Sequence, residues 1–158
     1  MSAQLIYDLA PLGSIVAWSD GTPRPPKHHC NRLSSWKCRN DVGQLVQKLG
    51  QTEARDISLP PSISLLLFDY GQIGPATLRA VRPFWLPCDL KFTVIERPAI
   101  GTILVLDAPG EDAELIYTAP SRKKARAWLK SHDYPNAVLQ EVTADQVAAD
   151  VVEGRMPA

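Results

Sequence analysis

The pattern of apolar and polar residues along this chain predicts strands that are interleaved with short helices. A continuous apolar run over residues 62–68 is typical of a buried central strand. Other segments that are rich in β-branched, aromatic or aliphatic residues are also predicted to be strands: residues 14–19, 90–96, 102–106, 114–119 and 138–142.

The clearest helical pattern covers residues 122–132. Ser121 is a suitable N-cap, and apolar residues recur at three-to-four spacing on one face at Ala125, Trp128 and Leu129. Interleaved strands and helices predict an α/β or α+β fold, with a single mixed β-sheet on which the helices pack.

Other segments give weaker patterns. A short helix is predicted over residues 31–39, with Asn31 as its N-cap, and a last helix over residues 144–153. The polar residues 50–58 are predicted to form an exposed connection, and residues 69–71 a turn. The segments that fit either a strand or a helix are residues 4–9, 42–49 and 76–81.

Length and charge limit the possible functions. The chain has 158 residues, of which 45% are hydrophobic, so we expect a single folded domain over residues 1–158. A formal net charge of zero removes the simplest sequence signal of a nucleic-acid-binding protein, a basic whole chain. Cations nevertheless greatly outnumber acids between Asp20 and Lys48, which predicts a basic surface on a neutral protein.

Cysteines and hydropathy indicate the compartment. Cys30, Cys38 and Cys88 are an odd set without the spacing of a disulfide framework, so we expect free thiols in a reducing environment. No apolar run approaches the roughly 18 residues that span a bilayer. We therefore expect a cytoplasmic protein that is not an integral membrane protein.

The main chemical motif is a Gly-x-x-Arg sequence directly after the first predicted strand. Gly21 lets the backbone approach a phosphate closely, while Thr22 and the loop amides can donate hydrogen bonds to its oxygens. Arg24 supplies a two-pronged donor, and Lys27 and Arg32 add positive charge. These residues are the predicted nucleotide and phosphate site. A solvated, proline-stiffened loop is the alternative interpretation.

Catalysis and DNA binding are predicted around the same loop. Asp20 and Arg24 are the candidate catalytic residues, because Asp20 is the carboxylate nearest to a bound phosphate and could hold Mg²⁺ or orient water. A turn aspartate serves the structure equally well. The cations predicted to contact DNA phosphates are Lys27, Arg32, Lys37 and Arg39.

Two further clusters contain possible metal ligands. His28, His29 and Cys30 with a lone Cys38 do not have the spacing of a closed zinc site, so we predict that no metal is bound there. An acidic cluster suits a divalent cation or, as we prefer, a charged hairpin that discourages edge pairing; it comprises Asp107, Glu111, Asp112 and Glu114.

The helix predicted over residues 122–132 begins with several cations. Cations in a first helical turn oppose the macrodipole, so they do not stabilise that helix. A contact with nucleic acid or an acidic partner and an ordinary solvated face are the two interpretations. The cations are Arg122, Lys123, Lys124, Arg126 and Lys130.

Taken together, several segments resemble the plasmid fertility-inhibition factors of the oncogenic-suppression (Osa) type: residues 5–7, 12–13, 18–26, 36, 121–128 and 134–135. That resemblance implies a fold of the ParB/sulfiredoxin superfamily, which binds nucleotide or nucleic-acid phosphates through a Gly-x-x-Arg element. Gly21 and Arg24 match the element. Pro25 and Pro26 depart from it by delaying the helix that often starts at this turn.

The resemblance implies a plasmid-encoded inhibitor of conjugative DNA transfer through a type IV secretion system. It would bind ATP and DNA, use ATP and Mg²⁺ as cofactors, and show at most weak ATPase or DNase activity. Its expected place is the cytoplasm, with the inner face of the bacterial inner membrane as an alternative. The rival hypotheses are a non-enzymatic module that blocks a secretion or transfer component through its basic loop and Trp/Arg surface, and a zinc-stabilised regulator.

Overall fold

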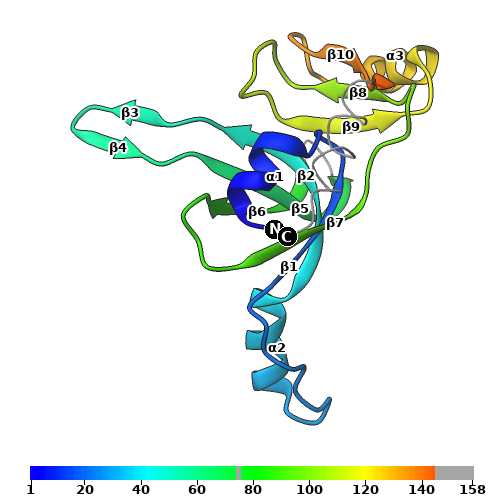
Figure 1. The fold of residues 1–158 in the computed structure, drawn as a ribbon. Helices are drawn as coiled ribbons and strands as arrows, with labels where there is room; N and C mark the ends of the chain where they lie inside the picture. Colours follow the sequence, from blue (N-terminus) through cyan, green and yellow to red (C-terminus); the bar gives the residue numbers. More distant parts are fainter. Residues whose placement is uncertain (74–75, 145–158) are drawn as a thin grey trace.

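The computed structural model describes residues 1–73 and 76–144 (Figure 1). Its helices are α1 (Ala3–Leu9), α2 (Cys30–Arg39) and α3 (Arg122–Lys130). Its strands are β1 (Ile15–Ser19), β2 (Asp41–Leu49), β3 (Thr52–Ala54), β4 (Ile57–Leu59), β5 (Ser62–Ile73), β6 (Ala76–Trp85), β7 (Lys91–Glu96), β8 (Ile103–Leu106), β9 (Leu115–Ala119) and β10 (Val138–Glu141).

The predicted α+β class is confirmed, but the single mixed sheet is wrong. The described strands form a five-stranded sheet in the order β6-β5-β2-β1-β7, a three-stranded sheet in the order β10-β8-β9, and the hairpin β3-β4. Each pairing in these sheets is antiparallel. Most consecutive strands are joined by connections too short for the crossover that a parallel pair needs.

The five-stranded sheet buries one face against α1. Trp18 of β1 lies at the centre of this core, with its ring 5.1 Å from that of Phe84, which in turn lies 5.4 Å from Phe92. Ile6 of α1 is fully buried in the same cluster. Ser2 caps α1 by accepting a hydrogen bond from the amide of Leu5, so seven residues suffice for the helix to form.

The three-stranded sheet packs between α3 and the larger sheet. All four residues of β8 are buried. Successive side chains point to opposite faces of the strand, and both faces are covered, one by α3 and the other by the larger sheet. Val105 contacts the cluster beneath α3, whereas Leu104 packs toward Val46 of β2. Arg79 ties β6 to this sheet, since its Nη1 lies 3.0 Å from Glu114 and its Nη2 donates to a backbone oxygen of β9 at 2.8 Å.

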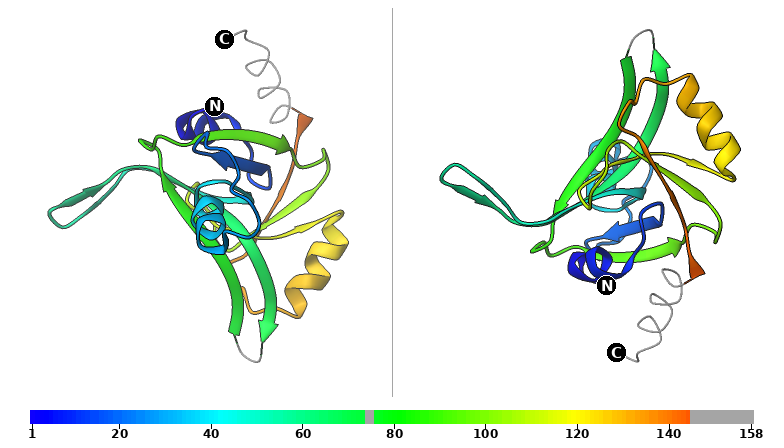
Figure 2. Two further views of the ribbon diagram at one scale, coloured as in Figure 1. Left: turned by 90° about the horizontal axis from the view of Figure 1, so that it is seen from below. Right: turned by 90° about the horizontal axis from the view of Figure 1, so that it is seen from above.

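Two segments project from these layers (Figures 1 and 2). The hairpin β3-β4 extends sideways, and every residue of its strands is exposed. We call the second projection the finger; it comprises residues 20–40, that is, the loop after β1 together with α2. Residues 51–58 are therefore exposed as predicted, whereas Gly50 is half-buried, and much of the segment is strand rather than an irregular connection.

Most predicted strands and helices are confirmed within a few residues, and the ambiguous segments form α1, β2 and β6. The turn predicted at residues 69–71 is wrong, because β5 continues to Ile73 beside β6 with shifts in register rather than a reversal. Ser121 caps α3, its Oγ accepting from the amide of Lys124. Asn31 is not the N-cap of α2, which begins at Cys30. The helix predicted over residues 144–153 lies almost wholly outside the described residues.

Candidate nucleic-acid interface

The finger is the most strongly charged projection of the molecule. Residues 21–40 contain five cations and no aspartate or glutamate. Helix α2 has no buried residue between Cys30 and Arg39, so it extends away from the sheets instead of packing on them (Figure 1). A concentration of one charge sign on a projecting element produces a strong local positive potential.

The base of the finger is organised by the carboxylate of Asp20. Its Oδ1 accepts hydrogen bonds from the Thr22 amide at 3.0 Å, the Thr22 hydroxyl at 2.6 Å and Asn40 Nδ2 at 3.0 Å. Its Oδ2 accepts from Arg39 Nε at 3.1 Å. The hydrogen bonds from Thr22, followed by those from Asn40 and Arg39, hold the pKa of Asp20 well below its usual range. The carboxylate is therefore ionised and engaged within the finger.

Asn40 joins the two ends of the finger to β1. Its Oδ1 accepts from the Ser19 hydroxyl at 2.7 Å and from the Asp20 amide at 3.3 Å. Its Nδ2 also donates to the backbone oxygen of Trp36 at 2.9 Å. The side chain is buried, at 9% exposure. The predicted helix over residues 31–39 ends just before Asn40, and no local sequence pattern indicated that this side chain connects the two ends of the finger.

Two tryptophan rings supply further links of the finger. Trp36 Nε1 donates to the backbone oxygen of Thr22 at 3.0 Å, which ties α2 to the preceding loop. Trp18 Nε1 donates to the backbone oxygen of Cys38 at 3.3 Å, which ties the end of α2 to the core. The finger is thus positioned by directional polar bonds at its base.

The structure divides the residues predicted for the phosphate site and for DNA contact into two groups. Gly21 and Thr22 belong to the base: the Gly21 amide donates to Ser19 Oγ at 3.0 Å, and both Thr22 donors are directed at Asp20. Gly21 has φ +82°, which fits a turn residue without a Cβ. The structure does not test the phosphate and catalytic roles predicted for these residues and Asp20, which stay predictions.

The second group consists of exposed cations without an ion-pair partner among the described residues: Arg24, Lys27, Arg32 and Lys37. Arg39 differs, because its guanidinium pairs with Asp20 and, at 3.5 Å, with Asp89. The four unpaired cations remain free for an anionic ligand, whereas Arg39 stabilises the base of the finger.

The histidines and cysteines that we considered as possible metal ligands, and predicted to bind none, also lie on the finger. The rings of His28 and His29 are 4.2 Å apart, and Cys30 and Cys38 are exposed free thiols. Within residues 1–73 and 76–144, no three His, Cys, Asp or Glu side chains are grouped closely enough to hold a metal ion.

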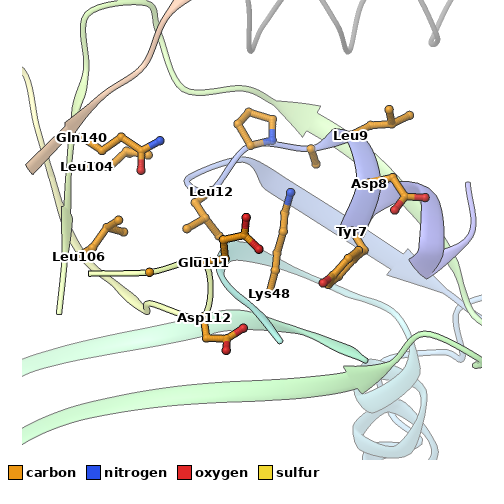
Figure 3. Close-up of a pocket in the computed structure, with 13 residues that line it drawn as sticks. Tyr7, Asp8, Leu9, Leu12, Lys48, Leu104, Leu106, Glu111, Asp112 and Gln140 are labelled. Atoms are coloured by element: carbon orange, nitrogen blue, oxygen red, sulfur yellow. The ribbon is translucent and has the colours of Figure 1, made fainter. Parts of the chain in front are cut away.

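The acidic residues around residues 109–110 have separate environments. Asp107 Oδ1 accepts from the amide of Glu114 at 2.8 Å, and the Glu114 carboxylate pairs with Arg79. Glu111 and Asp112 instead line a cavity (Figure 3).

That cavity has a volume of about 500 Å³ and lies between α1 and the three-stranded sheet (Figure 3). Asp8, Glu111 and Asp112 line it together with Lys48 and the apolar side chains of Leu12 and Leu104. Three carboxylates against one ammonium group disfavour a triphosphate. The ATP predicted from the sequence is therefore poorly matched to this cavity.

No helix in the described part of the chain is long and apolar enough to cross a membrane. No curated protein and no solved structure matches the chain significantly. Residues 1–146 match the family described as Uncharacterised conserved protein UCP036055. The match covers nearly the whole chain, from α1 to β10, and the protein therefore belongs to this family.

Proposed function

We propose that the chain binds DNA through backbone phosphates, with the finger as its contact surface. The observation that carries this proposal is the run of residues 21–40, which projects from the fold with five cations and no acid. The cations of such a segment repel one another, and the segment gains little apolar burial, since Leu33 and Trp36 are only half-buried, so folding does not account for its charge. A polyanion would relieve this repulsion and release counterions on binding.

The proposed contacts are to phosphates and not to base edges. Arg24 and Lys27 lie in the loop, and Arg32 and Lys37 lie on α2, so the charge is spread over the finger. Phosphate contacts of this kind orient a protein on DNA without reading the sequence. We therefore expect weak sequence preference and strong dependence of affinity on salt.

In the cell, we propose that this binding interferes with conjugative DNA transfer through a type IV secretion system, in the cytoplasm. The support is the resemblance to Osa-type factors, together with the unpaired cations of the finger. A fold like that of the ParB/sulfiredoxin superfamily is part of the same proposal. A protein that blocks transfer by binding DNA needs no catalytic residue. This agrees with the environment of the Asp20 carboxylate, which already accepts hydrogen bonds from Thr22, Asn40 and Arg39.

The proposal includes ATP and Mg²⁺ as ligands, because the resemblance to Osa-type factors implies them. The amides of Gly21 and Thr22 donate within the finger, so a phosphate at this turn must replace Ser19 and Asp20 as their acceptors. We therefore expect ATP, if it binds at this turn, to change the amide resonances of both residues. Unchanged resonances at saturating ATP would exclude the turn as the nucleotide site.

A salt titration tests the DNA proposal. In the finger variant, four glutamines replace the unpaired cations: Arg24→Gln, Lys27→Gln, Arg32→Gln and Lys37→Gln. Affinity for two unrelated DNA duplexes is measured by fluorescence anisotropy against salt. The slope of log affinity against log salt should fall by about 3 to 4, because each neutralised contact contributes about 0.9. The control variant Arg55→Gln neutralises an exposed cation of the β3-β4 hairpin, outside the finger and α3, and should keep the parent slope. Equal slopes for parent and finger variant would contradict the proposal.

A second candidate function is the non-enzymatic module that blocks a transfer component by protein contact. The exposed apolar residues of the β3-β4 hairpin favour it, since Ile57 is 64% exposed and Leu59 is 40% exposed. A mating assay separates the two functions. Inhibition that survives the finger variant but is lost with Ile57→Ser and Leu59→Ser would assign the effect to protein contact. The opposite result would assign it to DNA.

A further inference from the structure

Helix α3 presents a second basic surface that the finger does not explain. Its nine residues include five cations and no acid. The cations are all exposed, while Ala125 on the opposite side is fully buried against the three-stranded sheet. Arg122 lies 3.9 Å from Glu141, and the other four have no ion-pair partner in the described parts of the chain: Lys123, Lys124, Arg126 and Lys130.

Helix stability does not account for this charge. Three cations occupy the first turn of α3, where the macrodipole and the free amides favour acidic residues. Lys124 stands three residues after the N-cap Ser121, the position at which glutamate would complete a capping box. The sequence therefore places cations where they weaken the helix, which points to an anionic partner.

A stack of aromatic rings lies at the other end of the same helix. The Trp128 ring lies 4.7 Å from Tyr117 at an interplanar angle of 4°, and 3.8 Å from His132 at 11°. Tyr134 is 5.7 Å from Trp128 at 15°. All four rings are only half-buried, so part of this nearly parallel stack meets solvent beside the basic face. Exposed aromatic rings next to cations are the combination that binds unpaired bases and their phosphates.

We propose that α3 and this aromatic stack form a binding surface for single-stranded nucleic acid, separate from the finger. The cations hold successive phosphates, and an unpaired base adds to the stack at Trp128 and its neighbours. Duplex bases are already stacked on one another, so a duplex uses only the charges. The proposal does not depend on the function of the finger, because its residues and its ligand geometry are different.

The experiment uses the full chain carrying the four finger substitutions, so that the finger does not contribute. Lys123→Glu and Lys124→Glu are then added together. Because acids favour a helix N-terminus, this protein should unfold at the same or a higher temperature. Its affinity for an oligo(dT) strand should nevertheless fall at least about tenfold at low salt. Unchanged affinity would overturn the proposal. If the acidic pair does not fold, Lys123→Gln and Lys124→Gln must weaken binding in the same direction.

Base stacking on the aromatic rings is tested separately, with modified strands and one further variant. An abasic strand of equal length keeps the phosphates and should bind about fivefold more weakly or worse, the loss expected for one stacked base. His132→Ala should weaken binding of oligo(dT) but not of the abasic strand. Oligo(U) and oligo(dT) should bind comparably, and a preference for one identifies RNA or DNA as the natural strand. Equal binding of the abasic strand and oligo(dT), or tighter binding of a duplex, would overturn a single-strand site.

Discussion

Helices α2 and α3 both carry exposed cations and no acidic residue, but they are attached to the molecule by different forces. No residue of α2 is buried, and hydrogen bonds at the base of the finger hold it in place. Helix α3 instead packs an apolar face that includes Ala125 on the three-stranded sheet. Hydrogen bonds in partly hydrated places contribute modestly, whereas apolar packing contributes in proportion to buried area. Disturbing α2 should therefore alter local order, and disturbing α3 should alter the stability of the fold.

The largest contrast is expected between two tryptophans. Trp128→Ala removes the centre of the aromatic stack and of the packing under α3, and should lower the free energy of unfolding by about 3 kcal/mol. Trp36→Ala removes one hydrogen bond from the finger and should cost about 1 kcal/mol. Urea unfolding monitored by circular dichroism measures both. Equal losses would show that α2 is also held by packing.

Asn40→Ala should give the largest loss among substitutions that act through polar bonds alone. The buried amide bonds to Ser19, Asp20 and Trp36, so its removal leaves these groups unsatisfied and should cost about 2 kcal/mol. Amide exchange over α2 should accelerate more than exchange in the sheets. Asn31→Ala, at an exposed position on α2, is the matched control and should change stability by no more than about 0.5 kcal/mol. A uniform rise in exchange over the whole chain would contradict a local connector.

Gly21→Ala tests the backbone of the finger. A Cβ at this position meets nothing within 4 Å, so the cost comes from the φ of +82° alone and should be about 1 kcal/mol. Gly21→Asn should lose less, because asparagine adopts the left-handed conformation more readily. Thermal unfolding of the parent, Gly21→Ala and Gly21→Asn proteins measures the order of their stabilities. A loss for asparagine as large as that for alanine would show that strain is not the cause.

The smallest effect should appear in acid. The folded-state pKa of Asp20 is depressed, so its contribution to stability is complete above the unfolded value of about 3.8 and declines as the pH falls toward the folded value. Between about pH 5 and pH 2 the parent should lose stability more steeply than Asp20→Asn. The free energy of unfolding of both proteins is measured by urea titration at several pH values. Parallel curves would show that Asp20 does not cause the loss of stability in acid.

The parts of the fold that were predicted correctly depend on neighbours in sequence. The Ser121 cap and the apolar spacing at Ala125, Trp128 and Leu129 correctly predicted α3. The apolar run before Gly21 correctly predicted β1, and the gap in acidic residues identified the basic finger. Propensity, capping and charge density each act over a few residues, so a sequence displays them directly.

The tertiary structure decided which residues meet across the chain. Asn40 and Asp20 are 20 positions apart, and Arg79 and Glu114 are 35 apart, so no local pattern marks either pair. Continued pairing with β6 extends β5 through residues that would otherwise favour a turn, and antiparallel pairing divides the strands between separate sheets. The amino-acid sequence by itself determined helices α2 and α3, most strands and the cations of the finger. Only the fold determined that Asn40 bonds to Ser19 and Asp20, because a side-chain hydrogen bond requires atoms to lie within about 3 Å, a proximity that distant segments reach only after folding.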